Sequence, residues 1–325
     1  MYKMYEMELA GRTLTVDIGR VCAQANGAAL LKYGETTVLS TATASDKPRD
    51  GVDFFPLSVE YEEKMYAVGK IPGGFNKREG KASENAILTS RVIDRPMRPL
   101  FPKDYRNDVT LDNIVMSVDP DCSPELTAML GSAIATCISD IPFDGPCAMT
   151  QVGLIDGEFI INPTSAQKKV SDLALTVAST REKVIMIEAG AKEVPEQTMI
   201  DAIFKAHEVN KEVIKFIDRI VEECGKEKHE YEHVDTPEDL WDDMENDDFE
   251  EIIDVILGIR EDVKMYSRSV VRYLYQFLQK HKEVKYSDLL EVLKRAAERE
   301  LNDPDEQYPD RLISFSKLKQ ELERL

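Results

Sequence analysis

The sequence has few of the residues that build disulfide frameworks, zinc sites or common hydrolase centres. Its 325 residues include five widely spaced cysteines, with no C-x-x-C pair, and four histidines. This pattern argues against a disulfide framework or a zinc knuckle and favours a reducing cytoplasm. The motifs G-x-S-x-G, H-E-x-x-H and G-x-x-x-x-G-K-[ST] do not occur. The sequence therefore gives no motif evidence for a serine hydrolase, a zinc protease or a P-loop protein.

Long apolar runs are also lacking. The longest uncharged stretch, Leu126 to Ser139, is shorter than the roughly 20 residues that a membrane-spanning helix needs. The first residues, M-Y-K-M-Y-E-M-E, include no apolar signal segment. We therefore expect a cytoplasmic protein with no membrane partner.

Cations are scarce in the chain as a whole but concentrated in one short region. There are 41 Lys and Arg against 61 Asp and Glu, which gives a formal net charge of −20. Residues 64–106, however, hold 10 basic and 4 acidic residues, a net charge of +6. Because Lys and Arg drive phosphate binding, the overall balance argues against a general basic coat for nucleic acid but leaves room for one local groove.

Apolar periodicity predicts strands mixed with helices, which is an α/β (α+β) fold. Alternating residues predict strands within 5–62, including 23–32, 36–44 and 54–59, and then at 110–118, 148–155, 158–161, 173–178 and 184–189. Helices are expected from Ser83 to about Asp94, where Pro96 should end the first, and over 124–140 and 195–223. The last helix has an apolar stripe that includes Ile200, Phe204 and a histidine, His207, which we expect to be a satisfied core residue.

A change of composition follows this region. Residues 235–251 contain ten acidic residues and no basic one, which is typical of a solvated linker or the start of an acidic helix. We predict a first domain over 1–228, an acidic linker over 229–250 and a small all-α segment over 251–325. His229 and His233 should be solvated.

Residues 69–81 form a glycine-rich basic sequence, G-K-I-P-G-G-F-N-K-R-E-G-K. Glycines let a backbone approach phosphates closely, and cations supply the attraction. An aromatic ring here offers a flat face for a base of a single strand. Arginine forks, three of which follow, match phosphate oxygens two at a time. The candidate binding residues are Lys70, Phe75, Lys77, Arg78, Lys81, Arg91, Arg95 and Arg98. A solvated charged loop, with arginines paired to Asp94, explains the same residues without any ligand.

Two long motifs in this region carry a family resemblance. Y-E-E-K-M-Y-A-V-G-K-I-P-G-G-F-N-K-R-E-G and R-V-I-D-R-P-M-R-P-L-F-P closely resemble sequences of the polyribonucleotide nucleotidyltransferase (polynucleotide phosphorylase) family. The resemblance covers about residues 4–225 and is specific to the first of that family's two core domains. It implies a ribonuclease-PH-type fold of mixed sheets packed with helices.

The resemblance also implies a function. The family is a phosphorolytic 3′→5′ exoribonuclease of mRNA turnover that uses inorganic phosphate and Mg²⁺ to release nucleoside diphosphates. It forms a ring-shaped homotrimer, in which the loop matching Phe75-Asn76-Lys77-Arg78 lines a central pore and grips single-stranded RNA. The common form of that loop is F-F-R-R. With Asn76 in place of the second aromatic and Lys77 in place of an arginine, this chain halves the stacking and keeps the charge.

One departure from the family concerns catalysis. The family's phosphate and metal site lies in its second core, which we expect to be absent from these residues. The catalytic core carries a D-x-D-x-K pattern, whereas the equivalent strand here, D-L-A-L-T, keeps Asp172 but has Ala174 and Thr176 at the working positions. An alanine cannot hold a cation that needs oxygen ligands. We therefore predict no catalytic or metal residues, no Mg²⁺ or phosphate bound by this chain alone, and little or no activity.

An alternative from another class remains open. The chain would then be a non-enzymatic RNA-binding or assembly module, whose acidic helical tail docks a protein partner.

Overall fold

The computed structural model describes residues 2–49, 51–52 and 54–231. The chain divides into two units, Met1–Val234 and Asp235–Leu325, and the description concerns the first. Apart from residues 229–231, the predicted acidic linker and the predicted C-terminal helical segment lie outside the described residues, as does His233.

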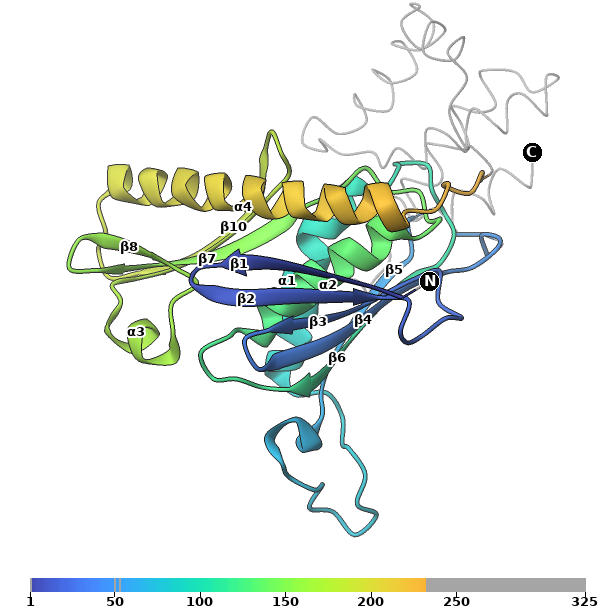
Figure 1. Cartoon of the computed structure of the whole chain (residues 1–325), viewed down its shortest axis with the longest axis horizontal. Helices are drawn as coiled ribbons and strands as arrows, with labels where there is room; N and C mark the ends of the chain where they lie inside the picture. The colour runs from blue at the N-terminus through green and yellow to red at the C-terminus, as the bar shows by residue number, and fades with distance from the viewer. Residues whose placement is uncertain (1, 50, 53, 232–325) are drawn as a thin grey trace, which may run out of the picture. The chain divides into compact units, whose positions relative to one another are not determined.

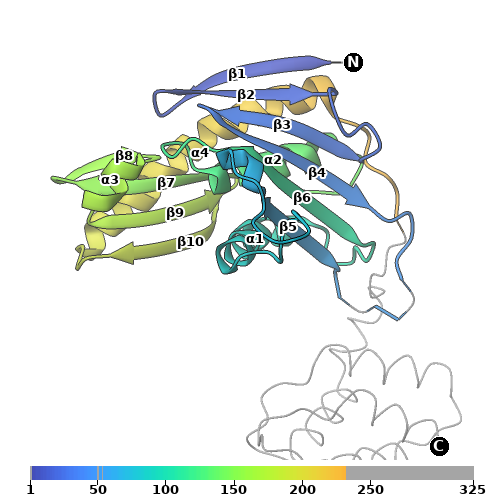
Figure 2. The ribbon, with the colours of Figure 1, turned by 90° about the horizontal axis from the view of Figure 1, so that it is seen from below.

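Two sheets form the core (Figure 2). The first has six strands in the order β1-β2-β3-β4-β6-β5, and all neighbours are antiparallel except β5 and β6. The second has the order β10-β9-β7-β8 and is antiparallel throughout. The strands are β1 (Lys3–Leu9), β2 (Arg12–Ile18), β3 (Gly27–Tyr33), β4 (Thr36–Ala44), β5 (Leu57–Glu63), β6 (Val109–Ser117), β7 (Ala148–Ile155), β8 (Glu158–Ile161), β9 (Leu173–Ser179) and β10 (Val184–Ala191).

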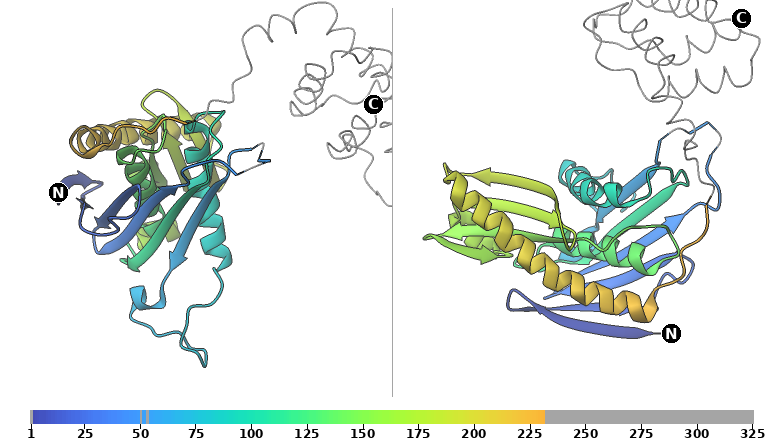
Figure 3. Two further views of the ribbon diagram at one scale, coloured as in Figure 1. Left: turned by 90° about the vertical axis from the view of Figure 1, so that its right-hand side faces the viewer. Right: turned by 90° about the horizontal axis from the view of Figure 1, so that it is seen from above.

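Helices pack between and along the sheets. Helix α2 (Pro124–Ile138) contacts strands of both sheets, and its residues from Leu126 onward are buried. Helix α4 (Glu196–Cys224) crosses the second sheet and reaches β1 of the first (Figure 3). The others are η1 (Met65–Val68), α1 (Glu84–Met97), η2 (Arg98–Leu100) and α3 (Ser165–Val170). Among the described residues, no helix is long and apolar enough to cross a membrane.

Helix α1 continues through the proline that we expected to end it. The prediction of an end near Asp94 is wrong, because α1 runs to Met97 with Pro96 inside its last turn. A proline removes its own N–H from the helical ladder and its ring crowds the carbonyl four residues earlier, but the amide of Arg98 still donates to the carbonyl of Asp94. Ile93 and Met97 are fully buried, so packing holds this turn in place despite the lost hydrogen bond.

Two strands begin later than predicted. β3 starts at Gly27 rather than at residue 23. At Gly27 the chain passes the backbone of α2 so closely that an added Cβ would lie 1.9 Å from the carbonyl oxygen of Ala135. β5 starts at Leu57 rather than at residue 54, directly after Pro56, which has no N–H for a ladder. The short helices η1 and α3 were not predicted.

Part of the predicted stripe on α4 faces solvent. Phe204 is 62% exposed and Ile200 is 38% exposed, because the small residues Ala202 and Ala206 of this turn make the contact with the second sheet. His207 is buried at 7% exposure, as expected, but its Nδ1 has no hydrogen-bond partner among the described residues. The expectation of a satisfied core histidine is therefore wrong in that respect.

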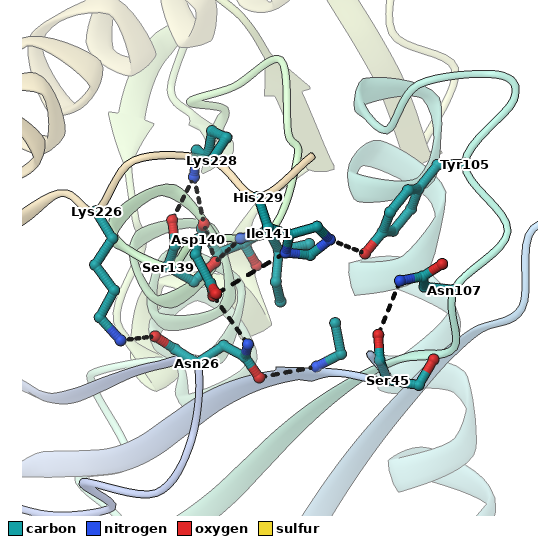
Figure 4. A network of polar contacts seen from close by, with 12 residues as sticks. Asn26, Ser45, Tyr105, Asn107, Ser139, Asp140, Ile141, Lys226, Lys228 and His229 are labelled. Atoms are coloured by element: carbon teal, nitrogen blue, oxygen red, sulfur yellow. Dashed lines mark hydrogen bonds and ion pairs between the residues drawn. The ribbon is translucent and has the colours of Figure 1, made fainter. Parts of the chain in front are cut away.

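After α4 the chain forms a strap, residues 225–231, across the end of α2 (Figure 4). The Lys228 ammonium donates to the carbonyls of Thr136, Cys137 and Ser139 at 3.2, 2.9 and 2.6 Å, and thereby satisfies acceptors that a helix C-terminus leaves free. Burial of this ammonium lowers the pKa of Lys228.

His229 belongs to the same strap and is not solvated as predicted. Its side chain is 26% exposed and lies 3.9 Å from the carboxylate of Asp140. Its Nε2 is 3.0 Å from the hydroxyl of Tyr105. The strap therefore fixes the point at which the chain leaves the core.

Lower pH should destabilise the core through His207. Burial, followed by the charge of Lys211, lowers the pKa of His207. The unfolded chain takes up this proton near pH 6.5, whereas the folded core does so only at lower pH. The contribution of His207 to stability is thus present above about pH 6.5 and is lost as the pH falls through the folded pKa, by about 1.4 kcal/mol per unit of pKa depression. Thermal unfolding at pH 7.5 and 5.5 should show a smaller difference for His207→Leu than for the parent, and equal differences would contradict this.

Candidate nucleic-acid interface

The basic segment forms a loop that projects from the body of the core. It leaves the end of β5, passes through η1 and returns at the start of α1 (Figure 1). Gly69, which ends η1, has the left-handed conformation, with φ 69° and ψ 23°, which glycine adopts without strain. No atom lies within 4 Å of an added Cβ at Gly73 or Gly74. The loop thus stands in open space.

The side chains predicted to bind RNA lie on this loop and are exposed. Phe75 is 102% exposed, so both faces of its ring are open. The loop also has four exposed cations, whose side chains make no hydrogen bond or ion pair within the described part of the chain. These are Lys70, Lys77, Arg78 and Lys81. Asn76 is exposed beside them. An open ring next to unpaired cations is the combination that grips single strands.

The two limbs of the loop are joined at its base. The Glu79 carboxylate accepts the backbone N–H of Met65 at 2.9 Å. Ser83 caps α1 by accepting the N–H of Ala86 at 3.0 Å, as predicted, and its hydroxyl lies 3.4 Å from the carboxylate of Glu63 at the end of β5.

The three arginines after the loop have different surroundings. Arg91 is exposed on α1 and has no side-chain partner within the described residues. Arg95, one turn further, lies 3.6 Å from Glu188 of β10. Arg98 donates to both carboxylate oxygens of Asp94, at 3.0 and 2.6 Å.

Arg98 also donates to two backbone carbonyls, those of Phe55 at 3.1 Å and Leu57 at 3.2 Å. Its guanidinium lies 5.9 Å from the ring centre of Phe55. These contacts indicate that Arg98 stabilises the start of β5. They leave its guanidinium less free to bind phosphate.

The strand with the D-L-A-L-T sequence does not fit Mg²⁺. Asp172 lies directly before β9, and its carboxylate is 3.5 Å from the ammonium of Lys192. Ala174 pairs with Gly190 across the sheet, so neither position has an oxygen-bearing side chain. Across residues 2–49, 51–52 and 54–231, no group of three or more His, Cys, Asp and Glu side chains could hold a metal ion.

The cysteines form no disulfide, and one acidic residue near Cys122 has a structural role. All five cysteines are free, with Cys122, Cys137 and Cys147 buried and Cys22 exposed. The Asp119 carboxylate accepts the backbone N–H of Asp121 at 3.0 Å, which lowers the pKa of Asp119, so this side chain stabilises a turn.

The fold and the sequence matches together define a class. The description "3' exoribonuclease family, domain 1" matches residues 10–142, and "3' exoribonuclease family, domain 2" matches residues 145–209. The first contains β2 to β6 of the six-stranded sheet, whose strand β1 precedes residue 10, and the second contains the whole four-stranded sheet. The crystal structure of rice (Oryza sativa) Rrp46 has the same fold, with a TM-score of 0.52 at 13% identity over 68% of this chain and 94% of that one. The chain belongs to the 3′ exoribonuclease family and has a ribonuclease-PH-type core.

Within that family the chain is similar to polyribonucleotide nucleotidyltransferases. The enzyme of Lachnoclostridium phytofermentans is 80% identical over 241 residues, which are 74% of this chain and 34% of that protein. The enzymes of Ruminiclostridium cellulolyticum and Alkaliphilus oremlandii are 61% and 58% identical over equal shares. The chain thus spans about a third of the length of these relatives and corresponds to their first core domain. The predicted family is confirmed, and so is the predicted ribonuclease-PH-type fold of the first domain.

Two features of the site were missed by sequence reasoning. Sequence reasoning assigned Glu79 no role of its own within the basic motif. Its one signal is that it is the only carboxylate between Lys64 and Ser83. The bonds from Arg98 to backbone carbonyls have no sequence signal, because they join segments about forty residues apart.

Proposed function

We propose that this core binds single-stranded RNA through its projecting loop, as part of a phosphorolytic 3′→5′ exoribonuclease that acts in mRNA turnover in the cytoplasm. The observation that carries the proposal is the fully exposed ring of Phe75 beside Lys77 and Arg78, which have no partner within the described residues. A stacked base contributes about 1–3 kcal/mol, and each phosphate contact adds attraction through released counterions.

The acidic remainder of the chain does not oppose this role. Residues 64–106 have a net charge of +6 within a chain at −20. At 0.1 M salt the screening length is about 10 Å, so a strand on a projecting loop interacts mainly with the cations next to it.

The arginines of α1 extend the proposed path of the RNA. Arg91 is the exposed cation nearest to the loop along the helix, and Arg95 follows one turn later, paired weakly with Glu188 at 3.6 Å. Phosphates could replace that exposed partner at little cost, since surface ion pairs contribute about 0–1 kcal/mol. We assign Arg98 to bracing the chain before β5.

We further propose that copies of the chain assemble around the RNA, as a ring of three. Large apolar side chains are exposed on the loop and on the first turns of α1, which is costly unless another surface covers them. They are Tyr66, Val68, Ile71, Ile87 and Leu88. Light scattering of the chain with RNA should give the mass of three chains, and the mass of one chain would contradict the ring.

Removal of the two adjacent cations tests RNA binding. Lys77→Ala with Arg78→Ala should weaken binding of oligo(A) about tenfold or more, and should lower the slope of log K against log[salt] by about 1.4, since each single-strand phosphate contact contributes about 0.7. The melting temperature should stay close to that of the parent, because both side chains are exposed.

The matched control is a second pair of adjacent exposed lysines, Lys168 and Lys169 on α3. Alanine at both control positions should leave affinity and salt slope nearly unchanged. If the loop variant bound RNA like the parent, or if both variants weakened binding equally, the loop would not be the binding site.

We propose that this core holds RNA and does not cut it. The support is the strand after Asp172, where Ala174 offers no oxygen and Lys192 neutralises the one carboxylate. Incubation of the chain with oligo(A), phosphate and Mg²⁺ should release little or no ADP. Robust ADP release, abolished by Asp172→Asn, would show that this strand is catalytic.

A further inference from the structure

A carboxylate stands in the middle of the proposed RNA-binding loop. From Lys64 to Ser83, both included, there are five basic residues and one acidic residue, Glu79. Glu79 directly follows Arg78, so its charge lies next to the cations that would contact phosphate. A negative charge there repels RNA and weakens the attraction of its neighbours. Its presence needs a reason other than contact with the ligand.

The structure supplies that reason as a hydrogen bond across the base of the loop. The Oε1 atom of Glu79 accepts the backbone N–H of Met65 at 2.9 Å and joins the outgoing limb to the returning one. Ser83 and Glu63 make a longer contact of 3.4 Å at the outermost base of the loop. The backbone hydrogen bonds inside the loop are local, such as Lys70 N–H to the carbonyl of Met65 and Lys77 N–H to the carbonyl of Gly74, both at 3.0 Å. Within the described residues, no side chain from 66 to 78 makes a hydrogen bond.

We propose that Glu79 is a positioning residue that closes the loop and holds Phe75, Lys77 and Arg78 in place for RNA. The inference rests on the proposed function of the loop. The bond restrains the loop directly after Arg78, and on the other side the chain turns at Lys77, whose φ of 51° lies in the left-handed region. Residues 69–71 and 73–81 are exposed, so packing restrains them little. A shorter closed loop has fewer conformations to lose when RNA binds.

Charge and position predict opposite results for Glu79→Ala, which makes the proposal testable. If Glu79 acted only through its charge, Glu79→Ala and Glu79→Gln would both bind RNA more tightly than the parent. If Glu79 holds the loop, Glu79→Ala loses the acceptor and binds more weakly despite the gain of one positive charge. Glu79→Gln keeps an oxygen acceptor for the N–H of Met65 and binds at least as tightly as the parent.

The experiment measures oligo(A) affinity for the full 325-residue chain and its variants at one salt concentration. We expect Glu79→Ala to weaken binding about fivefold, the effect of one hydrogen bond, and Glu79→Gln to restore it. Glu84→Ala is the matched control, because Glu84 is an exposed acid on the first turn of α1 without a partner among the described residues. It should bind RNA as tightly as the parent or slightly more tightly. Tighter binding by Glu79→Ala would overturn the proposal.

A second readout does not need RNA. Trypsin cuts after Lys and Arg, and the loop offers five such sites, of which Lys77 and Arg78 are next to Glu79 in the sequence. Cleavage in the loop should be about fivefold faster in Glu79→Ala than in the parent, and unchanged in Glu79→Gln and Glu84→Ala. Equal cleavage of Glu79→Ala and the parent would overturn the positioning role. If cleavage changes as expected but neither the parent nor any variant binds RNA, the positioning role of Glu79 stands. The proposed RNA-binding function of the loop then fails.

Discussion

Helix α2 passes between the two sheets with no face left for solvent. Every residue from Leu126 to Ile138 is buried, and a Cβ at Gly131 would lie 2.1 Å from the hydroxyl of Ser40 on β4. The polar groups of this contact are paired, because the hydroxyls of Ser40 and Ser132 both donate to the amide oxygen of Asn113, at 2.6 and 2.9 Å. One buried helix thus ties the sheets together. Segments outside this core, such as the loop between β5 and α1, are therefore not needed to hold the two sheets together.

The loop between β5 and α1 is the clearest example of a segment outside the core. It adds little to the core, since Phe75 and its neighbours are exposed, and it carries cations that have no partner within the described part of the chain. Water solvates these charges well, and both the charges and the open aromatic ring are available for a ligand. Two contacts restrain the base of the loop: the hydrogen bond between Glu79 and Met65, and the cap of α1 at Ser83. The proposed binding then depends on a few residues, although the whole chain is acidic.

Local patterns predicted much of the fold and the candidate site. The hairpin of 148–161 has the predicted bounds, because alternating residues around Asp-Gly depend only on near neighbours. The loop was found from its glycines and cations. Errors arose where distant contacts decide the outcome: packing of Met97 carries α1 through Pro96, and small residues displace Phe204 from the sheet. The role of Glu79 was missed because its partner is a backbone N–H fourteen residues away.

The central claim is that RNA lies on the loop, and mapping the contact by photocrosslinking tests it most directly. Single-stranded RNA containing 4-thiouridine would be irradiated with the full chain, and the crosslinked peptides would be identified by mass spectrometry. Crosslinks should fall within residues 69–81, with Phe75 the foremost site, and should extend along α1 to Arg91. Crosslinks concentrated on the outer face of β1 or on α3, with none in the loop, would contradict the account.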